Sequence, residues 1–376
     1  MRHKAGTQSV RRRRGLATLI NGRFLAKPPS GVTLVARELT RALLAEIALM
    51  PQCDRPRIDF AAPAGHLPPL PPGFDLEAHR SWLRLTPGPR SISGEQMLLP
   101  QLRGARQVLN FCNAAPVLAS RLVVWIHDAQ VFDSPDSYSP GFRLYAQSML
   151  GLMRLRRAEI ATVSAYSKSR LEAHGFAAER ISVTPNGGDH LQKTPPDGET
   201  LARHGLSPGG YGFLVGSRAR HKNIPFAVQA LLAEGPPELD IAVAGLQQAG
   251  SYEGDALPAH PRLRLLPRIT DGEMRALLQG ARFVMCPSLD EGFGLSAAEA
   301  LWEEAPLALS QRAALPEVGG DAALYFDPQN PRDIAETARL LCLNEVRHML
   351  KEKAAIQKKR LTWASAAQTT LTRFLL

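Results

Sequence analysis

Short apolar runs alternate with longer segments of helical period along most of the chain. The runs lie at 16–20, 108–111, 122–126, 160–163 and 181–184, and then at 213–215, 241–244, 263–265, 283–286, 306–309 and 324–326. Segments such as 31–50 and 141–157 lie between them and repeat their apolar residues at helical spacing. Repeated strand–helix alternation predicts right-handed crossovers and parallel sheets with helices on both faces. The pattern therefore predicts an α/β protein made of two doubly wound domains.

Glycine and proline residues separate the two series of strands. They are concentrated in 186–212, which we expect to be the hinge between a first domain at 16–188 and a second at 189–358. The last segment, 359–376, has a helical composition. The proline-studded stretch 51–100 is expected to be rich in loops, with one or two poorly marked strands such as 58–61.

Composition excludes several classes of protein. Apolar residues make up 44% and charged residues 21% of 376, so both domains can bury a core. No window is long and apolar enough for a membrane-spanning helix. The four cysteines are far apart and form no C-x-x-C pair, which argues against a disulfide framework or a zinc site and favours the cytoplasm. Only 6% of residues are aromatic, and no stacking motif accompanies the basic residues, so nucleic-acid binding is not expected.

The net charge of +10 is concentrated in part at the N-terminus. Residues 1–15 contain Arg2, Lys4 and the run Arg11 to Arg14 without any acid, and we expect a disordered basic tail there. This tail is either a solvated extension or a segment attracted to anionic lipid headgroups at the inner face of the plasma membrane. The same two alternatives apply to the basic run at 358–360.

The stretch 286–300 carries the most informative motif. A strand runs into a turn with Gly292 and Gly294, and a helix is expected to begin near Leu295. Glycines let a ligand approach the backbone closely, and the amides of a helix start can hold a phosphate. Glu291 and Glu299 are placed on either side of this start.

Three interpretations of this motif are open from its residues alone. It could be a plain tight turn followed by a solvated helix face. It could be a relaxed dinucleotide fingerprint, Gly292-x-Gly294-x-x-Ala297, although the following strand ends in Ser310 and Gln311 where a ribose-binding acid is expected. It could also be a nucleotide-sugar site with the spacing Glu-x7-Glu.

The block 286–300 resembles the C-terminal signature of family 4 glycosyltransferases. Further blocks similar to this family follow one another in the expected order, at 20–25, 30–39, 123–128, 162–167, 183–187, 215–223 and 315–328. The resemblance implies the GT-B architecture, in which two Rossmann-like domains face a cleft and the last helix crosses back to the first domain. The chain departs from the family at Ser217, where an arginine is common, and at Glu304, where a glycine is expected.

The resemblance also implies roles for individual residues. His127, Glu291 and Lys222 are the catalytic candidates, with Glu291 facing the sugar and Glu299 binding the ribose hydroxyls. As a lone residue, His127 could equally be a satisfied core histidine. The further donor-binding candidates are Gly31, Ser217, Arg218, Arg220, Arg268, Ile269, Gly292, Phe293, Gly294 and Leu295. Asp128, Cys112 and Asn113 are candidates on the acceptor side.

The family implies a metal-independent hexosyltransferase that retains the anomeric configuration. The leaving nucleoside diphosphate gains negative charge, which Lys222, a neighbouring arginine and backbone amides can meet without a metal, and no D-x-D motif occurs in the chain. The overall likeness is to bacterial mannosyltransferases of polysaccharide assembly, with GDP-mannose as the leading donor and a saccharide or lipid-linked saccharide as acceptor. A UDP-sugar donor, an NAD(P)-dependent oxidoreductase and a non-catalytic binding protein are the alternatives.

Overall fold

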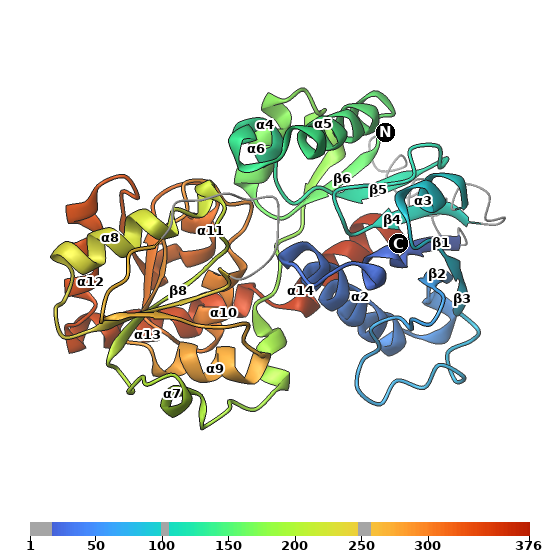
Figure 1. Cartoon of the computed structure of the whole chain (residues 1–376). Coiled ribbons are helices and arrows are strands. Elements are labelled where there is room, and N and C mark those ends of the chain that lie inside the picture. The colour runs from blue at the N-terminus through green and yellow to red at the C-terminus, as the bar shows by residue number, and fades with distance from the viewer. Residues whose placement is uncertain (1–16, 99–104, 247–256) are drawn as a thin grey trace, which may run out of the picture.

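The computed structural model describes residues 17–98, 105–246 and 257–376, which form two lobes, each built on a parallel sheet (Figure 1). The sheet of the first lobe has the strand order β3-β2-β1-β4-β5-β6-β7. Its strands are β1 (Ala17–Asn21), β2 (Ile58–Pro63), β3 (Leu83–Gly88), β4 (Ala105–Asn110), β5 (Leu122–Trp125), β6 (Glu159–Thr162) and β7 (Ile181–Val183). The expected ranges of the apolar runs agree with these strands to within a few residues. The stretch 51–100 contains two of the strands, β2 and β3, of which the sequence marked only the first.

Helices cover both faces of this sheet because consecutive strand residues point to opposite sides. Leu19 belongs to the apolar cluster on one face and Ile20 to the cluster on the other. The helices are α2 (Gly31–Leu49), α3 (Ile92–Leu98), α4 (Gln130–Asp133), α5 (Pro140–Leu155) and α6 (Ala165–Ala173). α2 begins where the Ser30 hydroxyl accepts from the Thr33 amide, which satisfies one of the free donors of the helix start.

The second lobe repeats this design with six strands in the order β10-β9-β8-β11-β12-β13. They are β8 (Tyr211–Val215), β9 (Asp240–Ala244), β10 (Leu263–Leu265), β11 (Phe283–Cys286), β12 (Leu307–Ser310) and β13 (Ala323–Phe326). The helices are α8 (Ile224–Glu234), α9 (Asp271–Gly280), α10 (Leu295–Trp302), α11 (Leu315–Gly319), α12 (Pro331–Leu340) and α13 (Asn344–Gln357). The segment between the lobes contains the short helix α7 (Thr200–Arg203).

The chain returns to the first lobe at its end. Helix α14 (Trp363–Thr370) and the π-helical turn Leu371–Leu375 pack into the apolar cluster that also holds the inner face of α2. The rings of Trp125 and Phe374 lie 5.5 Å apart in an edge-to-face arrangement. In Figure 1 this red segment lies beside the blue α2, away from the other helices of its own half. The expected two-lobed fold with a returning last helix is confirmed.

Two expectations concern membranes and the N-terminal tail. The residues expected to form that tail, 1–15, lie outside the described residues. Within the described ranges, no helix combines the length and the apolar character that crossing a bilayer requires.

Candidate active site at the facing edges of the two sheets

Each sheet has a point at which the strand order reverses. In the first lobe this point lies between β1 and β4, and in the second it lies between β8 and β11. Ligands of open parallel sheets bind outside the carboxyl ends of the strands at such a switch point, because the loops there diverge to opposite faces. The loops that follow the strands of the two sheets also contact each other across the lobes, so both switch points open toward the same region.

Lys222 and Glu291 join the two strands of the second switch point. Lys222 follows β8 and Glu291 follows β11, and the ammonium Nζ lies 2.8 Å and 2.6 Å from the two carboxylate oxygens. Their side chains are 25% and 13% exposed. Burial alone would lower the pKa of Lys222, but the charge and hydrogen bond of Glu291 outweigh burial, and this pKa lies above its ordinary value. The pair is therefore a fixed charge pair within reach of a ligand.

The loop that carries Lys222 is fixed at both of its sides. It contains the 3-10 turn Arg220–Lys222 and ends at Asn223, whose φ of 55° is in the left-handed region that asparagine tolerates. The buried His221 contacts the Ser137 hydroxyl of the first lobe at 3.1 Å, and its carbonyl accepts from the Leu289 amide at 2.7 Å. The contacts of His221 thus hold the loop in place, and the next residue, Lys222, meets Glu291.

Gly292 brings the second lobe into direct contact with the first. A Cβ atom at this position would lie 2.3 Å from the His127 carbonyl oxygen, so only glycine fits. The Gly292 carbonyl accepts from the hydroxyls of Ser164 and Ser167, at 2.7 Å and 3.0 Å. This close approach sets Glu291 beside the strand end that carries His127 and Asp128.

His127 is buried and neutral. Its Nε2 lies 2.9 Å from the Phe111 carbonyl oxygen, to which it donates, and Nδ1 is then the acceptor nitrogen of the ring. Burial lowers the pKa of His127 to about 4. Burial has the opposite effect on its neighbour, and together with the charges of Asp290 and Glu291 it raises the pKa of Asp128 to about 6.

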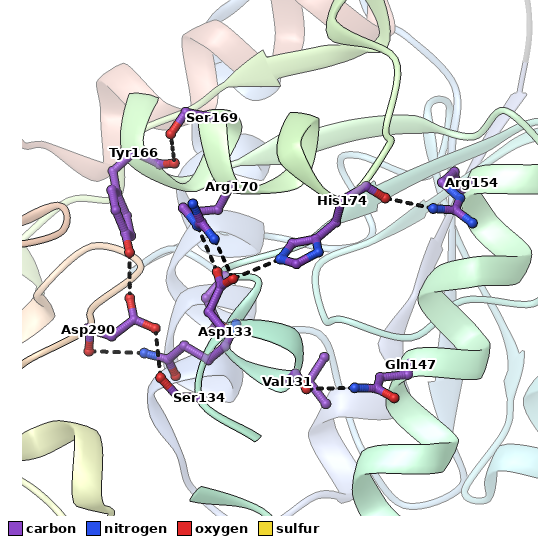
Figure 2. Close-up of polar contacts among 12 residues, drawn as sticks. Val131, Asp133, Ser134, Gln147, Arg154, Tyr166, Ser169, Arg170, His174 and Asp290 are labelled. Carbon is purple, nitrogen blue, oxygen red and sulfur yellow. Dashed lines mark hydrogen bonds and ion pairs between the residues drawn. The ribbon is translucent and has the colours of Figure 1, made fainter. Parts of the chain in front are cut away.

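Asp290 fastens the second lobe to α4 and α6 of the first. Its carboxylate accepts from the Tyr166 hydroxyl at 3.0 Å and from the Ser134 hydroxyl at 3.3 Å, and its carbonyl accepts from the Gln130 amide group at 3.1 Å (Figure 2). Asp133, on the same segment as Ser134, is held by Arg170 of α6. These contacts position the turn that presents Glu291 and the start of α10.

The N-terminus of α10 lies where the two lobes meet. Gly294, the residue before the helix, has a φ of 98°, and no side chain caps the helix start. Leu295 packs against the cores of both lobes, and a Cβ atom on Gly31, at the start of α2, would lie 3.5 Å from its side chain. The first amides of α10 have no partner within the helix, which makes this end suitable for an anion.

Glu299 is paired with the segment that connects the lobes. Its carboxylate lies 3.2 Å from Nε2 of His190, and both side chains are at most 10% exposed. Burial alone would lower the pKa of His190, but the hydrogen bond and charge of Glu299 outweigh burial and raise it. The other nitrogen of His190 is 3.4 Å from Trp363 Nε1, so this histidine also contacts the returning helix α14.

The other candidate residues predicted from the sequence lie in loops around the Lys222–Glu291 pair or at the end of β4. Asn113 accepts from the His127 amide at 2.9 Å, and Cys112 is buried at the end of β4, where burial raises the pKa of its thiol. The remaining donor-site candidates lie in loops after β8, β10 and β11: Ser217, Arg218, Arg220, Arg268, Ile269 and Phe293. Phe293 is buried, whereas Arg218, Arg220 and Arg268 are exposed.

The sequence did not predict a polar cluster at the first switch point. Arg23, after β1, forms an ion pair of 2.9 Å with Glu95 of α3, and their side chains are 8% and 1% exposed. Asn21 donates to Glu95 and to Asn110, which ends β4. Arg23 Nε and Asn110 Nδ2 are buried without a hydrogen-bond partner among the described residues. Asn21 and Arg23 lie in a block that carried the family resemblance, but nothing in the stretch 51–100 marked Glu95.

No metal-binding cluster is found in the part of the chain that the structure describes. Three or more histidine, cysteine, aspartate or glutamate side chains that could share an ion do not come together in those residues. The donors near Lys222 are cationic or backbone groups, which suit an anion.

The fold and the facing switch points define a two-domain protein of the GT-B class. A solved structure of WaaG, a glycosyltransferase involved in lipopolysaccharide biosynthesis, matches with a TM-score of 0.64 at 13% identity and covers 95% of this chain and 100% of that one. The Anabaena protein HepE in complex with UDP-glucose matches with a TM-score of 0.69 at 16% identity, over 96% of this chain and 99% of that one. At these identities the likeness concerns the fold alone.

The sequence comparisons match part of the chain to a family model and to glycosyltransferases. Residues 210–357 match the family model described as glycosyl transferases group 1. The O-antigen chain mannosyltransferase B of Escherichia coli is 27% identical over 277 residues, which are 69% of this chain and 72% of that protein. The chain therefore carries a group 1 glycosyltransferase domain and is a glycosyltransferase.

Proposed function

We propose that this glycosyltransferase moves mannose from GDP-mannose to a hydroxyl of a saccharide, with retention at the anomeric carbon. The likeness to the O-antigen chain mannosyltransferase supports mannose as the sugar. It also supports a role in assembling a bacterial surface polysaccharide, and we propose a lipid-linked saccharide as the acceptor. We place this work in the cytoplasm, at the inner face of the plasma membrane.

The observation that carries the proposal is the Lys222–Glu291 pair at the β8/β11 switch point. A nucleotide sugar bound here would set its diphosphate near Lys222 and the uncapped start of α10, with Arg218 or Arg220 closing over it. Glu299 would accept from the ribose hydroxyls, one helical turn further along α10. The donor would thus lie across the switch point, where a Rossmann-like sheet binds a nucleotide.

The same pair accounts for the chemistry of transfer. As the glycosidic bond to the diphosphate breaks, the leaving group gains negative charge, and the ammonium of Lys222 stabilises this charge more than that of the ground state. The sugar becomes electron-deficient at its anomeric carbon, and the carboxylate of Glu291 faces it. His127 would accept a hydrogen bond from a sugar hydroxyl at Nδ1, and Asp128 and Asn113 would face the acceptor. No step in this sequence calls for a metal.

A UDP-sugar is the second candidate donor. HepE, whose fold matches over nearly its whole length, is a structure in complex with UDP-glucose. Backbone groups near the base would decide between guanine and uracil.

A thermal-shift screen of nucleotide sugars tests the proposal, because a ligand that binds only the native state raises the melting temperature. GDP-mannose should raise it more than UDP-glucose, UDP-N-acetylglucosamine or NADH does. The anomeric coupling of the product, measured by NMR, then tests retention. A larger shift with NADH than with every nucleotide sugar would overturn the proposed donor class, and an inverted product would overturn retention.

A further inference from the structure

A polar cavity lies at the end of the first sheet opposite to the candidate active site, where the strands begin. Its volume is about 330 Å³, and it is lined by residues at the amino ends of β5 and β6, by Gln107 of β4 and by the residue that precedes β7. Four of the lining residues are arginines, namely Arg121, Arg156, Arg157 and Arg180, and one is an acid, Glu159. Cavities of this size hold small ligands in other proteins. We propose that this arginine-lined cavity binds a phosphoryl group.

The arginines are only partly neutralised by the protein. Arg157 forms an ion pair of 3.6 Å with Glu179, and both side chains are about two-thirds exposed. Arg156 donates to the Ala119 carbonyl at 3.3 Å, which is a long hydrogen bond to a neutral group. The side chain of Arg121 has no hydrogen bond or ion pair with the residues that the structure describes. The cavity is thus lined by four guanidinium groups and a single carboxylate, that of Glu159.

Arg180 provides the most direct sign of a missing partner. Its Nη1 donates to the Arg157 carbonyl at 2.8 Å, which fixes the guanidinium against the turn between α5 and β6. Its Nε is buried and has no hydrogen-bond partner within the described chain. A buried donor without a partner destabilises the structure, more so when it is charged. The Nη2 group of Arg180, for which the described residues provide no partner, can donate to an oxyanion in the cavity.

The number of arginines at the cavity favours a phosphoryl group over a simple carboxylate. Arg157 has a φ of 51°, a left-handed conformation that turns the chain sharply from α5 into β6 and keeps two consecutive arginines at the cavity. A phosphate has three or more oxygens and about two negative charges, and arginine forks bind such groups through paired hydrogen bonds. A phosphoryl group, with more oxygens and more charge than a carboxylate, can therefore engage more than one of these arginines at once.

The cavity is separate from the donor site. Apart from Gln107 in β4, its residues precede β5, β6 and β7 or lie at the amino ends of β5 and β6, whereas His127 and Ser164 follow β5 and β6 at the other end of these strands. The phosphoryl group therefore belongs to a second ligand, and this inference stands whether or not the proposed donor is right. Two exposed leucines, Leu118 and Leu155, adjoin the cavity-lining residues Ala119 and Arg156 and are 68% and 76% exposed. The phosphate could thus come from a lipid headgroup or from a soluble phosphoester.

The test compares two double variants of the full chain. Arg121→Gln/Arg156→Gln removes two charges from the cavity. Arg143→Gln/Arg332→Gln removes two charges from positions outside it, and so leaves the net charge equal in the two proteins. Inorganic phosphate is titrated at constant ionic strength while the melting temperature is followed. Any binding of phosphate at the donor site is common to both variants and cancels in the comparison.

The cavity variant should bind phosphate at least about tenfold more weakly than the control, since a charge-assisted hydrogen bond is worth a factor of that order. Equal affinities in two folded variants would overturn the proposal. Co-sedimentation with phosphatidylglycerol vesicles and phosphatidylcholine vesicles separates the two sources. Loss of binding to the anionic vesicles in the cavity variant alone identifies a lipid headgroup. Equal vesicle binding, together with the weakened phosphate binding, identifies a soluble phosphoester.

Discussion

The switch points of the two sheets have the same topology but different polar groups. In the second lobe, Lys222 and Glu291 form a pair that is accessible to a ligand, with side chains 25% and 13% exposed. In the first lobe, Arg23 and Glu95 are sealed, at 8% and 1%. Charges kept near solvent can exchange their partner for a ligand, whereas sealed charges cannot do so without a large desolvation cost.

This difference in exposure is what we expect between charges that bind a ligand and charges that stabilise the fold. The pair in the second lobe lies within the part that matches the group 1 glycosyltransferase model, residues 210–357. The sealed cluster lies outside that part and connects β1, α3 and β4. We infer that the first lobe uses its switch point to hold the loop after β1 in place, and that the second uses its own for the reaction.

The largest expected effect comes from breaking the sealed pair. Glu95→Ala would leave the guanidinium of Arg23 buried without its carboxylate, and removing one partner of a buried ion pair costs about 3–5 kcal/mol of stability. The free energy of unfolding, from urea denaturation, measures it. The matched control is Asp240→Ala, which breaks the Arg264–Asp240 pair, with side chains 39% and 25% exposed. That control should lose less than about 1 kcal/mol. Similar losses in both would mean that the cluster is not structural.

Breaking the accessible pair should affect turnover rather than folding. Lys222→Ala removes the cation that would meet the leaving diphosphate, and the loss of one such group commonly lowers kcat by about 10²–10³. KM for the nucleotide sugar should change much less, because the cation acts mainly in the transition state. Lys222→Arg, which keeps the charge, should recover part of the rate. A loss confined to KM would place Lys222 in ground-state binding only.

The sequence brings the candidate residues of the second lobe together more directly than the polar residues of the first, for a physical reason. Glu291, Gly292, Gly294 and Glu299 lie within one strand–turn–helix unit, so their spacing in the chain fixes their arrangement in space. The sealed cluster unites residues 74 positions apart, Asn21 and Glu95, and no local pattern encodes such a contact.

The sequence also did not predict which side chains the candidate residues would contact. Glu299 was expected to face a ribose, and nothing indicated that His190 of the connecting segment would lie 3.2 Å from it. Glu304, which stands where the family resemblance leads to a glycine, has a φ of 55°, so the backbone there keeps the glycine-like conformation. Its carboxylate pairs with Lys351 and Lys358 of the following helical segment. These ion pairs of Glu304 depend on residues that the tertiary fold brings together, so a single sequence does not reveal them.

His190 and Glu299 form a pair between the connecting segment and the second lobe, and the stability that it contributes should depend on pH. The pKa of His190 is raised by Glu299, so the stabilisation from this pair is fully present below the ordinary histidine value of about 6.5 and is lost as the pH rises through the raised pKa. At the acid end it should amount to about 1.5–3 kcal/mol, the range for a hydrogen bond to a charged group. The difference in unfolding free energy between the wild type and His190→Asn should therefore shrink from pH 6 to pH 9. The exposed His348, replaced in the same way, is the control for removing a histidine that has no part in this pair.

The smallest expected effect is that of a chelator, which should leave turnover unchanged. Lys222 and the uncapped amides at the start of α10 provide positive charge at the point where the diphosphate would gain its negative charge. A divalent ion would compete with the ammonium for the same carboxylate, Glu291, and for the same phosphate oxygens. The initial rate is measured with and without EDTA, after dialysis against the chelator. If EDTA abolishes transfer and magnesium or manganese restores it, the second switch point works through a metal. In that case the difference between an accessible ion pair and a sealed one does not explain how the two lobes differ.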